Sequence, residues 1–344
     1  MASAAQKRIK SISYAKYGYF FILPFFIVYS IFQLWPLINT FILSFYGNGN
    51  ASANNSASTD VAVGLDNYNV LLFGGDKRSL QQQHEMFVSS LGNTLILWIG
   101  NFIPQIILSL SLAVWFTSAR LKIVGKGFFK VVMYMPNIIT AASVSVLFLS
   151  LCADKGTINQ ILDNFGFDKV NFIENTHARG TVMFIQTWMW FGNTMIMLMS
   201  GIMGINPSLF EAAEIDGANG MQTFWKVTVP LLSPILVYTV VTSMIGGLQM
   251  FDIPFLFHHG NSDMVNEDIQ TVAVYIFRRY KNKNGYQFGY AGAASVLLLF
   301  ITVVLGFITF YMNRDKDEIA KRKQRRKLMK QAKAKSKQFG GLSI

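Results

Sequence analysis

Three carboxylates lie close together in one polar stretch of the chain, residues 206–230. Glu211, Glu214 and Asp216 fall within six positions of one another, and such a density of acids is rare in helices that face lipid. The residues around this group carry no signature of a catalytic pocket. The group therefore indicates a polar contact surface rather than acid–base catalysis.

The polar stretch begins with signals for a helix. Asn206-Pro207 predicts a break from the apolar segment before it. Ser208 and Glu211 have the spacing of a capping box, in which the side chains of the two residues satisfy two unpaired backbone N–H groups. A helix of its own is therefore expected at the start of the stretch.

The second half of the polar stretch predicts a turn and another helix. Gly217 and Gly220 bracket the turn, because glycine tolerates the positive φ at which a helix stops. A short helix is expected from Met221 to Val229, ending at Pro230. Such a helix–turn–helix is common in soluble domains, but a plain connector between membrane helices needs only a few residues. We therefore interpret the stretch as a coupling element that projects beyond the bilayer.

Other chemistry-bearing motifs are missing from the sequence. Gly125-Lys126 lacks the upstream glycine and the following Ser or Thr of a P-loop, so the chain is not expected to bind ATP. No Gly-x-Ser-x-Gly nucleophile motif occurs, and the single cysteine, Cys152, excludes an internal disulfide and a cysteine-rich metal site. The histidines show no ligand spacing and are interpreted as structural; they are His84, His177, His258 and His259.

Composition places the elements around the polar stretch in a membrane. Of 344 residues, 52% are hydrophobic and 14% are charged, against about 25% charged in soluble domains. Six segments without Asp, Glu, Lys or Arg each hold the roughly 20 apolar residues that cross a bilayer. Such spans must be helical, because an open sheet leaves backbone groups unpaired in lipid. The segments are Tyr17–Thr59, Met86–Ala119, Val131–Ala153, Gly180–Phe210, Val227–Phe251 and Asn284–Asn313.

The first apolar segment is predicted to be a retained span. It follows four basic residues, as a signal peptide does, but its apolar run is too long for one and no small-residue cleavage site follows. Trp35-Pro36 indicates a kink or a boundary in it. With a cytoplasmic N-terminus, 21 of the 30 Lys and Arg residues fall on the cytoplasmic side, which is the usual bias. Both termini and the polar stretch are therefore expected in the cytoplasm.

These assignments predict an all-α, polytopic fold in five parts. The loop Gly47–Asp60 is rich in Asn, Ser and Ala, and the basic tail Arg314–Lys337 is interpreted as an anchor near anionic lipid. The tail lacks the aromatic residues that would support nucleic-acid binding. The parts are a cytoplasmic segment 1–16, a first transmembrane helix 17–45, an extracellular loop 46–88, a core 89–313 with five transmembrane helices, and a cytoplasmic tail 314–344.

The polar stretch resembles the EAA loop of ABC importer permeases. The resemblance rests on Glu211-Ala212-Ala213, Asp216-Gly217-Ala218, Phe224 and Pro230-Leu231. Further segments are similar to the carbohydrate-uptake permeases related to the maltose and glycerol-phosphate systems, and the likeness covers Leu91 to Asn313. These segments are Phe128-Phe129 to Met135-Pro136, Gly156 to Asn159, Trp188 to Gly192, Gln249 to Asp252, and Gly285 to Ala291.

The chain departs from this family at one place. A Thr-x-Gly-Gly-Pro segment often follows the Phe-Asp pair in the family, whereas this chain reads His258-His259-Gly260-Asn261. The departure leaves open which residues at the outer rim would contact a substrate or a binding protein.

The resemblance implies a division of labour. The chain would have the type I ABC importer permease fold with six transmembrane helices, in a prokaryotic inner or plasma membrane. It would pair with a second, homologous permease, with two copies of a cytoplasmic ATPase that bind ATP and Mg, and with an extracellular or periplasmic solute-binding protein. It would hold no cofactor and would not itself be an enzyme. Contact with the ATPase would fall to Glu211, Ala212, Ala213, Asp216 and Gly217.

A sugar pathway is the further implication. Sugars present hydroxyls and flat apolar ring faces, so their sites combine amides or carboxylates with aromatic planes. Packing between helices is the alternative role for the same side chains. The candidates are Asn137, Gln186, Trp188, Trp190, Asn193, Gln249, Phe251 and Asp252.

Two other classes of protein remain open from the sequence. A secondary transporter or channel would also have six spans, but it is expected to place charged or unwound sites in mid-membrane. A membrane enzyme would need a catalytic cluster on one face. Co-purification with an ATPase distinguishes the three classes.

Overall fold

The computed structural model describes residues 15–47, 61–118, 121, 123–257, 266–281, 287–312, 325 and 328–329. Several predictions from the sequence fall outside these residues. They concern the N-terminal segment, most of the Asn- and Ser-rich loop, the basic tail apart from three residues, His258 to Asn261, and Gly285-Tyr286.

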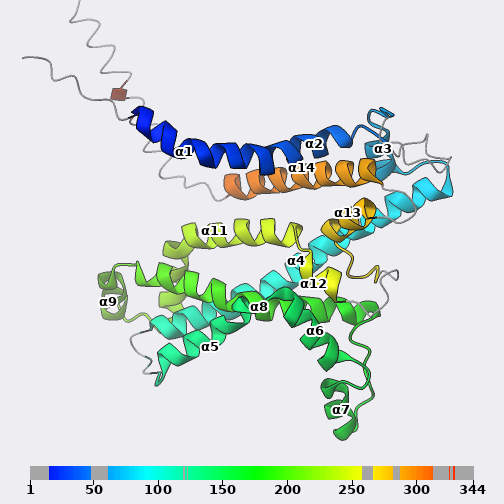
Figure 1. Cartoon of the computed structure of the whole chain (residues 1–344). Helices are drawn as coiled ribbons and strands as arrows, with labels where there is room; N and C mark the ends of the chain where they lie inside the picture. The colour runs from blue at the N-terminus through cyan, green and yellow to red at the C-terminus, as the bar shows by residue number, and fades with distance from the viewer. Residues whose placement is uncertain are drawn as a thin grey trace, which may run out of the picture. The chain divides into compact units, whose positions relative to one another are not determined.

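The described chain is helical, with one isolated β-bridge between Tyr46 and Ala62. Figure 1 shows the helices in chain order. They are α1 (Ala15–Tyr29), the π-helix η1 (Ser30–Leu34), α2 (Trp35–Leu43), α3 (Asp66–Phe73), α4 (Arg78–Thr117), α5 (Lys126–Ile138), α6 (Ala141–Cys152), α7 (Thr157–Asn164), α8 (Asn175–Met203), α9 (Pro207–Ile215), α10 (Gly220–Thr223), the π-helix η3 (Phe224–Thr228), α11 (Val229–Leu248), α12 (Asp252–Leu256), α13 (Val272–Tyr280) and α14 (Phe288–Met312).

The described helices include five that are long and apolar enough to cross a membrane, or six if α8 and α9, which bend by 74° at their junction, count as one span. The predicted all-α, polytopic fold is confirmed. The third charge-free segment is divided into α5 and α6, because Thr140 adopts an extended conformation and its side chain accepts a hydrogen bond from the Ser143 N–H at 3.3 Å. Thr140 is therefore the N-cap of a new helix.

In the described part of the chain, each of the two π-helical turns lies two residues before a proline. η1 ends at Leu34 and is followed by Pro36, and η3 ends at Thr228 and is followed by Pro230. Proline lacks an N–H group, and its ring crowds the carbonyl four residues earlier. A wider turn at that point lets the helix continue. The kink or boundary expected at Trp35-Pro36 thus coincides with the end of η1.

The chain forms two compact units, and residues 1–90 with 272–298 make up the first. Within it, Asn67 is buried, and its amide donates to the carbonyls of Ser44 at 2.9 Å and Tyr46 at 3.1 Å. A Cβ atom on Gly289 would lie 2.3 Å from the Tyr46 carbonyl oxygen. Glycine at this position therefore lets α14 approach the backbone that follows α2.

A buried tyrosine holds α13 within the first unit. Tyr275 is 1% exposed, its hydroxyl donates to Gln83 at 3.3 Å, and its ring packs edge-on against Phe87. Arg279 lies over the same ring, 5.0 Å from its centre. Burial raises the pKa of Tyr275 to about 12, against the opposing effect of the Arg279 charge.

The second unit comprises residues 91–271 and 299–344. Its helices α5 and α8 pack closely, side by side in Figure 1. The crossing requires glycine, because a Cβ atom on Gly192 would lie 2.0 Å from the carbonyl oxygen of Met133. A cluster of buried apolar residues lies at the C-terminal end of α8. It includes Leu112 of α4, Leu198 of α8 and Leu232 of α11.

Polar side chains join α4 to α8 inside the second unit. The Gln105 amide donates to the Thr194 hydroxyl at 2.7 Å, and the Ser109 hydroxyl donates to the Phe191 carbonyl at 2.7 Å. Gln105, Ser109 and Thr194 are all buried. Hydrogen bonds of this kind are the usual means of fixing one membrane helix against another, and they hold two of the helices that line the site described below.

Candidate functional site

The polar stretch begins with a helix whose cap differs from the predicted one. The side chain of Asn206 accepts a hydrogen bond from the Ser208 N–H at 3.1 Å, and Pro207 occupies the first turn of α9. The predicted capping box of Ser208 and Glu211 is therefore wrong. Proline has the helical φ built in and needs no hydrogen-bonded N–H at the first position, so the helix starts before Ser208. Glu211 lies further along α9 with its side chain exposed.

The end of α9 is a glycine-stopped cap. Gly217 has a φ of +75°. Its N–H donates to the Glu214 carbonyl at 3.0 Å, and the N–H of Ala218 donates to the Ala213 carbonyl at 2.9 Å. This pair of bonds is a Schellman motif, in which the residue after the cap needs the left-handed conformation. The predicted turn at Gly217 is confirmed, with Asp216 as the cap residue.

The second half of the polar stretch does not end at Pro230. Gly220 is the first residue of α10, and Asn219 and Gln222 form the capping box, with both reciprocal bonds at 2.9 Å. From Gly220 the helix continues through η3 into α11 and α12 as one candidate span, Gly220–Leu256. The predicted end at Pro230 is wrong, because η3 accommodates the proline within the helix.

Most of the polar stretch is exposed, although Thr228 near its end is buried. α9 has no buried residue and α10 has none, whereas Phe210 packs against the apolar cluster at the end of α8. Four large apolar side chains of the stretch remain exposed, namely Leu209 at 44%, Ile215 at 86%, Met221 at 66% and Trp225 at 61%. The stretch therefore combines exposed apolar side chains with the exposed carboxylates Glu211, Glu214 and Asp216.

A polar cavity of about 550 Å³ lies in the second unit, a size typical of small-molecule sites. α4, α5, α8, α11 and α12 all contribute to its wall. Seven of the eight predicted pathway residues line it, together with others that the sequence did not single out. The predicted residues are Asn137, Gln186, Trp190, Asn193, Gln249, Phe251 and Asp252.

Helical periodicity explains which tryptophan of α8 reaches the cavity. Gln186, Trp190 and Asn193 recur at intervals of four and three, and they share one face of α8. Trp188 lies on another face, where its ring packs edge-on against Phe148 at 5.5 Å and joins the neighbouring apolar core. Its contacts are those of a packing residue.

Several cavity residues escaped the prediction. Trp98 donates from its indole N–H to the Ser243 hydroxyl at 3.2 Å, and a Cβ on Gly247 would lie 2.2 Å from the indole ring. The signal was present, since the missed polar residues recur at helical spacing within apolar spans. They are Asn101, Gln105, Thr194, Tyr238, Thr239, Thr242 and Ser243. Side chains of these types also join neighbouring membrane helices, as Gln105 does with Thr194, so residue type alone did not separate a cavity wall from helix packing.

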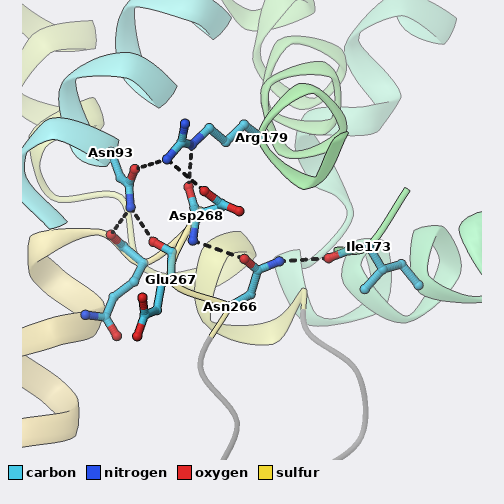
Figure 2. Close-up of polar contacts among 7 residues, drawn as sticks. Asn93, Ile173, Arg179, Asn266, Glu267 and Asp268 are labelled. Atoms are coloured by element: carbon cyan, nitrogen blue, oxygen red, sulfur yellow. Dashed lines mark hydrogen bonds and ion pairs between the residues drawn. The ribbon is translucent and has the colours of Figure 1, made fainter. Parts of the chain in front are cut away.

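An ion pair fixes the segment that follows α12. Figure 2 shows Arg179 of α8, whose guanidinium contacts the Asp268 carboxylate and the Asn93 side-chain oxygen, both at 2.9 Å. Arg179 Nε also donates to the Asp268 carbonyl at 2.8 Å. The Asn93 amide donates to the carbonyls of Glu267 and Gln270. We call Asn93, Arg179 and Asp268 the polar clamp. It joins α4, α8 and residues 266–271.

The polar clamp positions the cavity wall through one further bond. The Thr271 hydroxyl donates to the Met250 carbonyl at 2.7 Å, and Met250 lies between the cavity residues Gln249 and Phe251. The clamp therefore holds the backbone that carries Gln249, Phe251 and Asp252. Among the residues that the structure describes, no group of three His, Cys, Asp or Glu residues could hold a metal ion.

An exposed, self-capped helical hairpin and a polar cavity among apolar helices together define a multi-pass membrane permease. The chain belongs to the family described as binding-protein-dependent transport system inner membrane components, whose model matches residues 105–315.

Named relatives and solved structures agree with this family. The lactose transport permease LacF of Rhizobium radiobacter is 27% identical over 92% of this chain and all of that protein. The arabinooligosaccharide permease AraP of Bacillus subtilis is 28% identical over 91% of this chain and 94% of that protein. A bacterial ABC transporter that imports the acidic polysaccharide alginate has the same fold, with a TM-score of 0.73, 23% identity, and coverage of 89% of this chain and 97% of that one. The resemblance to carbohydrate-uptake permeases is confirmed.

Proposed function

We propose that the chain is the transmembrane permease subunit of an ATP-driven, binding-protein-dependent importer for a sugar or oligosaccharide. It forms half of the translocation pathway. The polar stretch docks on a separate ATPase and transmits its movement to the spans.

The exposed hairpin carries this proposal. Both of its helices have caps formed within the stretch itself, so its shape does not depend on burial. Ile215, Met221 and Trp225 expose apolar surface beside Glu211, Glu214 and Asp216. A docking groove that buries the apolar side chains and pairs with the carboxylates fits both features.

The cavity supports a sugar as cargo. Trp98, Trp190 and Phe251 offer aromatic planes for ring faces, while amides and hydroxyls on the same wall can pair with sugar hydroxyls. LacF, AraP and the multiple-sugar permease MsmF are relatives named for sugar transport. Their names support the same substrate class here.

The remaining partners follow from the same proposal. The chain pairs with a second, homologous permease, and two ATPase copies each bind one polar stretch and supply ATP hydrolysis. A solute-binding protein delivers the sugar from outside, as a solved alginate transporter is described in complex with a pentasaccharide-bound periplasmic protein. Both termini lie in the cytoplasm, which agrees with the excess of basic residues on that side.

Cysteine labelling tests the proposed docking. The only cysteine, Cys152, is buried, so Cys152→Ser gives a background without thiols. Ile215→Cys or Met221→Cys is then added, and a membrane-impermeant maleimide is applied to intact cells and to inverted vesicles. We expect labelling in inverted vesicles alone, and loss of labelling when the ATPase subunits are bound. Phe165→Cys is the control. Phe165 is exposed and lies on the extracellular side in the predicted topology, so this cysteine is expected to react in intact cells.

Two results would contradict the proposal. Labelling of residue 215 from outside intact cells would place the polar stretch on the wrong side of the membrane. Sugar uptake by the reconstituted complex that depends on an ion gradient and not on ATP would instead support a secondary transporter.

A further inference from the structure

The cavity wall carries a single negative charge among its described residues. Among the described residues that line it, Asp252 is the single charged side chain, and no Lys, Arg or His is present. Asp252 is exposed, at the start of α12. The rest of the wall consists of amides, hydroxyls, aromatic rings and apolar groups.

Such a wall discriminates between sugars by charge. Hydroxyl groups of a neutral sugar can exchange water for the amides and hydroxyls of the wall. A sugar carboxylate would lose water without meeting a cation on this subunit's wall, and an unpaired charge in a site surrounded by apolar helices is costly. Asp252 would repel it as well, with part of the repulsion screened by water because this side chain is exposed.

The polar clamp keeps Asp252 at this wall. Thr271 is bonded to the carbonyl of Met250, two residues before Asp252, and Arg179 fixes the segment that ends at Thr271. The guanidinium of Arg179 is engaged by Asp268 and Asn93 and is not part of the cavity wall. The nearby cation of the clamp is thus committed to a structural contact.

Resting on the proposed function, we infer that this permease selects uncharged saccharides and excludes uronic acids, with Asp252 as the specificity-determining residue. The structurally similar alginate importer handles an acidic polysaccharide. The shared fold is therefore compatible with acidic and with uncharged saccharides. The side chains of the cavity wall determine which of the two is selected.

The test compares matched sugars on the complete transporter. The complex is reconstituted in proteoliposomes with its solute-binding protein, and a panel of neutral di- and trisaccharides is screened for ATP-dependent uptake. The best neutral sugar is then compared with its terminal uronic acid, which carries one carboxylate, and with its 2-amino form, which carries a positive charge. Each sugar is supplied at a concentration that saturates the binding protein, as checked by a separate titration.

We expect the uronic acid to enter roughly tenfold more slowly than the neutral sugar, and the amino sugar to show no such loss. Asp252→Asn is expected to raise the uronate-to-neutral ratio of uptake rates by about tenfold, while Asp252→Glu, which keeps the charge, leaves the ratio low. Asp163→Asn, at an exposed carboxylate of α7 outside the cavity, is the matched control and leaves the ratio unchanged.

The outcomes separate this inference from the proposed function. Uronate uptake equal to or faster than neutral uptake would overturn charge selection while leaving the importer assignment intact. Equal exclusion of the uronic acid and the amino sugar would overturn the role of Asp252, because loss of water would then explain the selection without repulsion. Failure of every sugar to enter with ATP would instead refute the proposed function.

Discussion

Gly217 offers a direct test of the proposed coupling between the polar stretch and an ATPase. Its φ of +75° lies in the left-handed region, and no atom lies within 4 Å of the position that a Cβ would take. A side chain at residue 217 therefore meets open space. Any effect of a substitution within this chain must come from backbone strain.

The magnitude follows from that geometry. An L-residue in the left-handed region costs about 1–2 kcal/mol, and asparagine is the side chain that tolerates it best. Gly217→Asn should therefore leave the stability of the helix cap nearly unchanged. Gly217→Ala should destabilise the cap by about 1 kcal/mol, and Gly217→Val should destabilise it further because its β-branch adds crowding. The strain would be relieved by breaking the Gly217 and Ala218 hydrogen bonds that end α9.

The assay measures coupling rather than folding. Each variant is purified with its partners in proteoliposomes, and the number of sugars transported per ATP hydrolysed is determined. We expect Gly217→Val to assemble normally but to transport fewer sugars per ATP, with Gly217→Ala intermediate and Gly217→Asn near the unaltered protein. A circular dichroism melt checks that the helical content of the spans is unchanged.

The order of the three variants in sugars transported per ATP distinguishes backbone strain from steric obstruction. If Asn, which is bulkier than Ala, impairs coupling more than Ala does, the side chain obstructs the ATPase groove and backbone strain is not the cause. If all three variants couple normally, the cap at Gly217 is not needed for transmission.

Three further predictions concern stability. Gly192→Ala should lower the free energy of unfolding by about 2 kcal/mol, since its Cβ would lie 2.0 Å from a backbone oxygen; Gly180→Ala on the same helix meets no atom within 4 Å and should melt like the parent. Arg179→Met should lower the free energy of unfolding by about 2 kcal/mol. An unchanged melting temperature would show that the polar clamp does not stabilise the fold. Burial raises the pKa of Tyr275 to about 12, so stability should fall as pH rises from the unfolded value near 10 to 12, by about 3 kcal/mol; Tyr275→Phe should remove that loss.

The membrane helices were predictable because long gaps between charges are required by the bilayer itself. The irregularity at Trp35-Pro36 was also predictable from its proline, but two other irregularities were not. The break between α5 and α6 depends on Thr140 capping the next helix, and an isolated threonine in an apolar segment has many possible roles. Pro230, which normally ends a helix, is accommodated by the π-turn before it, and no pattern in the sequence announces that turn.

The candidate site was predictable where a residue type is unusual for its surroundings. The carboxylates of the polar stretch and the amides Gln186 and Asn193 met that condition. The clamp residues Arg179 and Asp268 did not, because they are ordinary charges in a predicted loop region and lie 89 positions apart. The spacing of Ser208 and Glu211 predicts a capping box, but Pro207 at the first position of α9 makes Asn206 the cap.

The continuous helix from Gly220 to Leu248 connects the polar stretch to the cavity wall. At about 1.5 Å per residue it is roughly 40 Å long, with the hairpin at one end and Thr242 and Ser243 of the cavity wall toward the other. A tilt of about 10° around its midpoint would displace each end by about 3–4 Å at that length. That shift is comparable to the diameter of a water molecule. If an ATPase moves the polar stretch as proposed, a displacement of that size at one end of this helix would reach the cavity wall at the other.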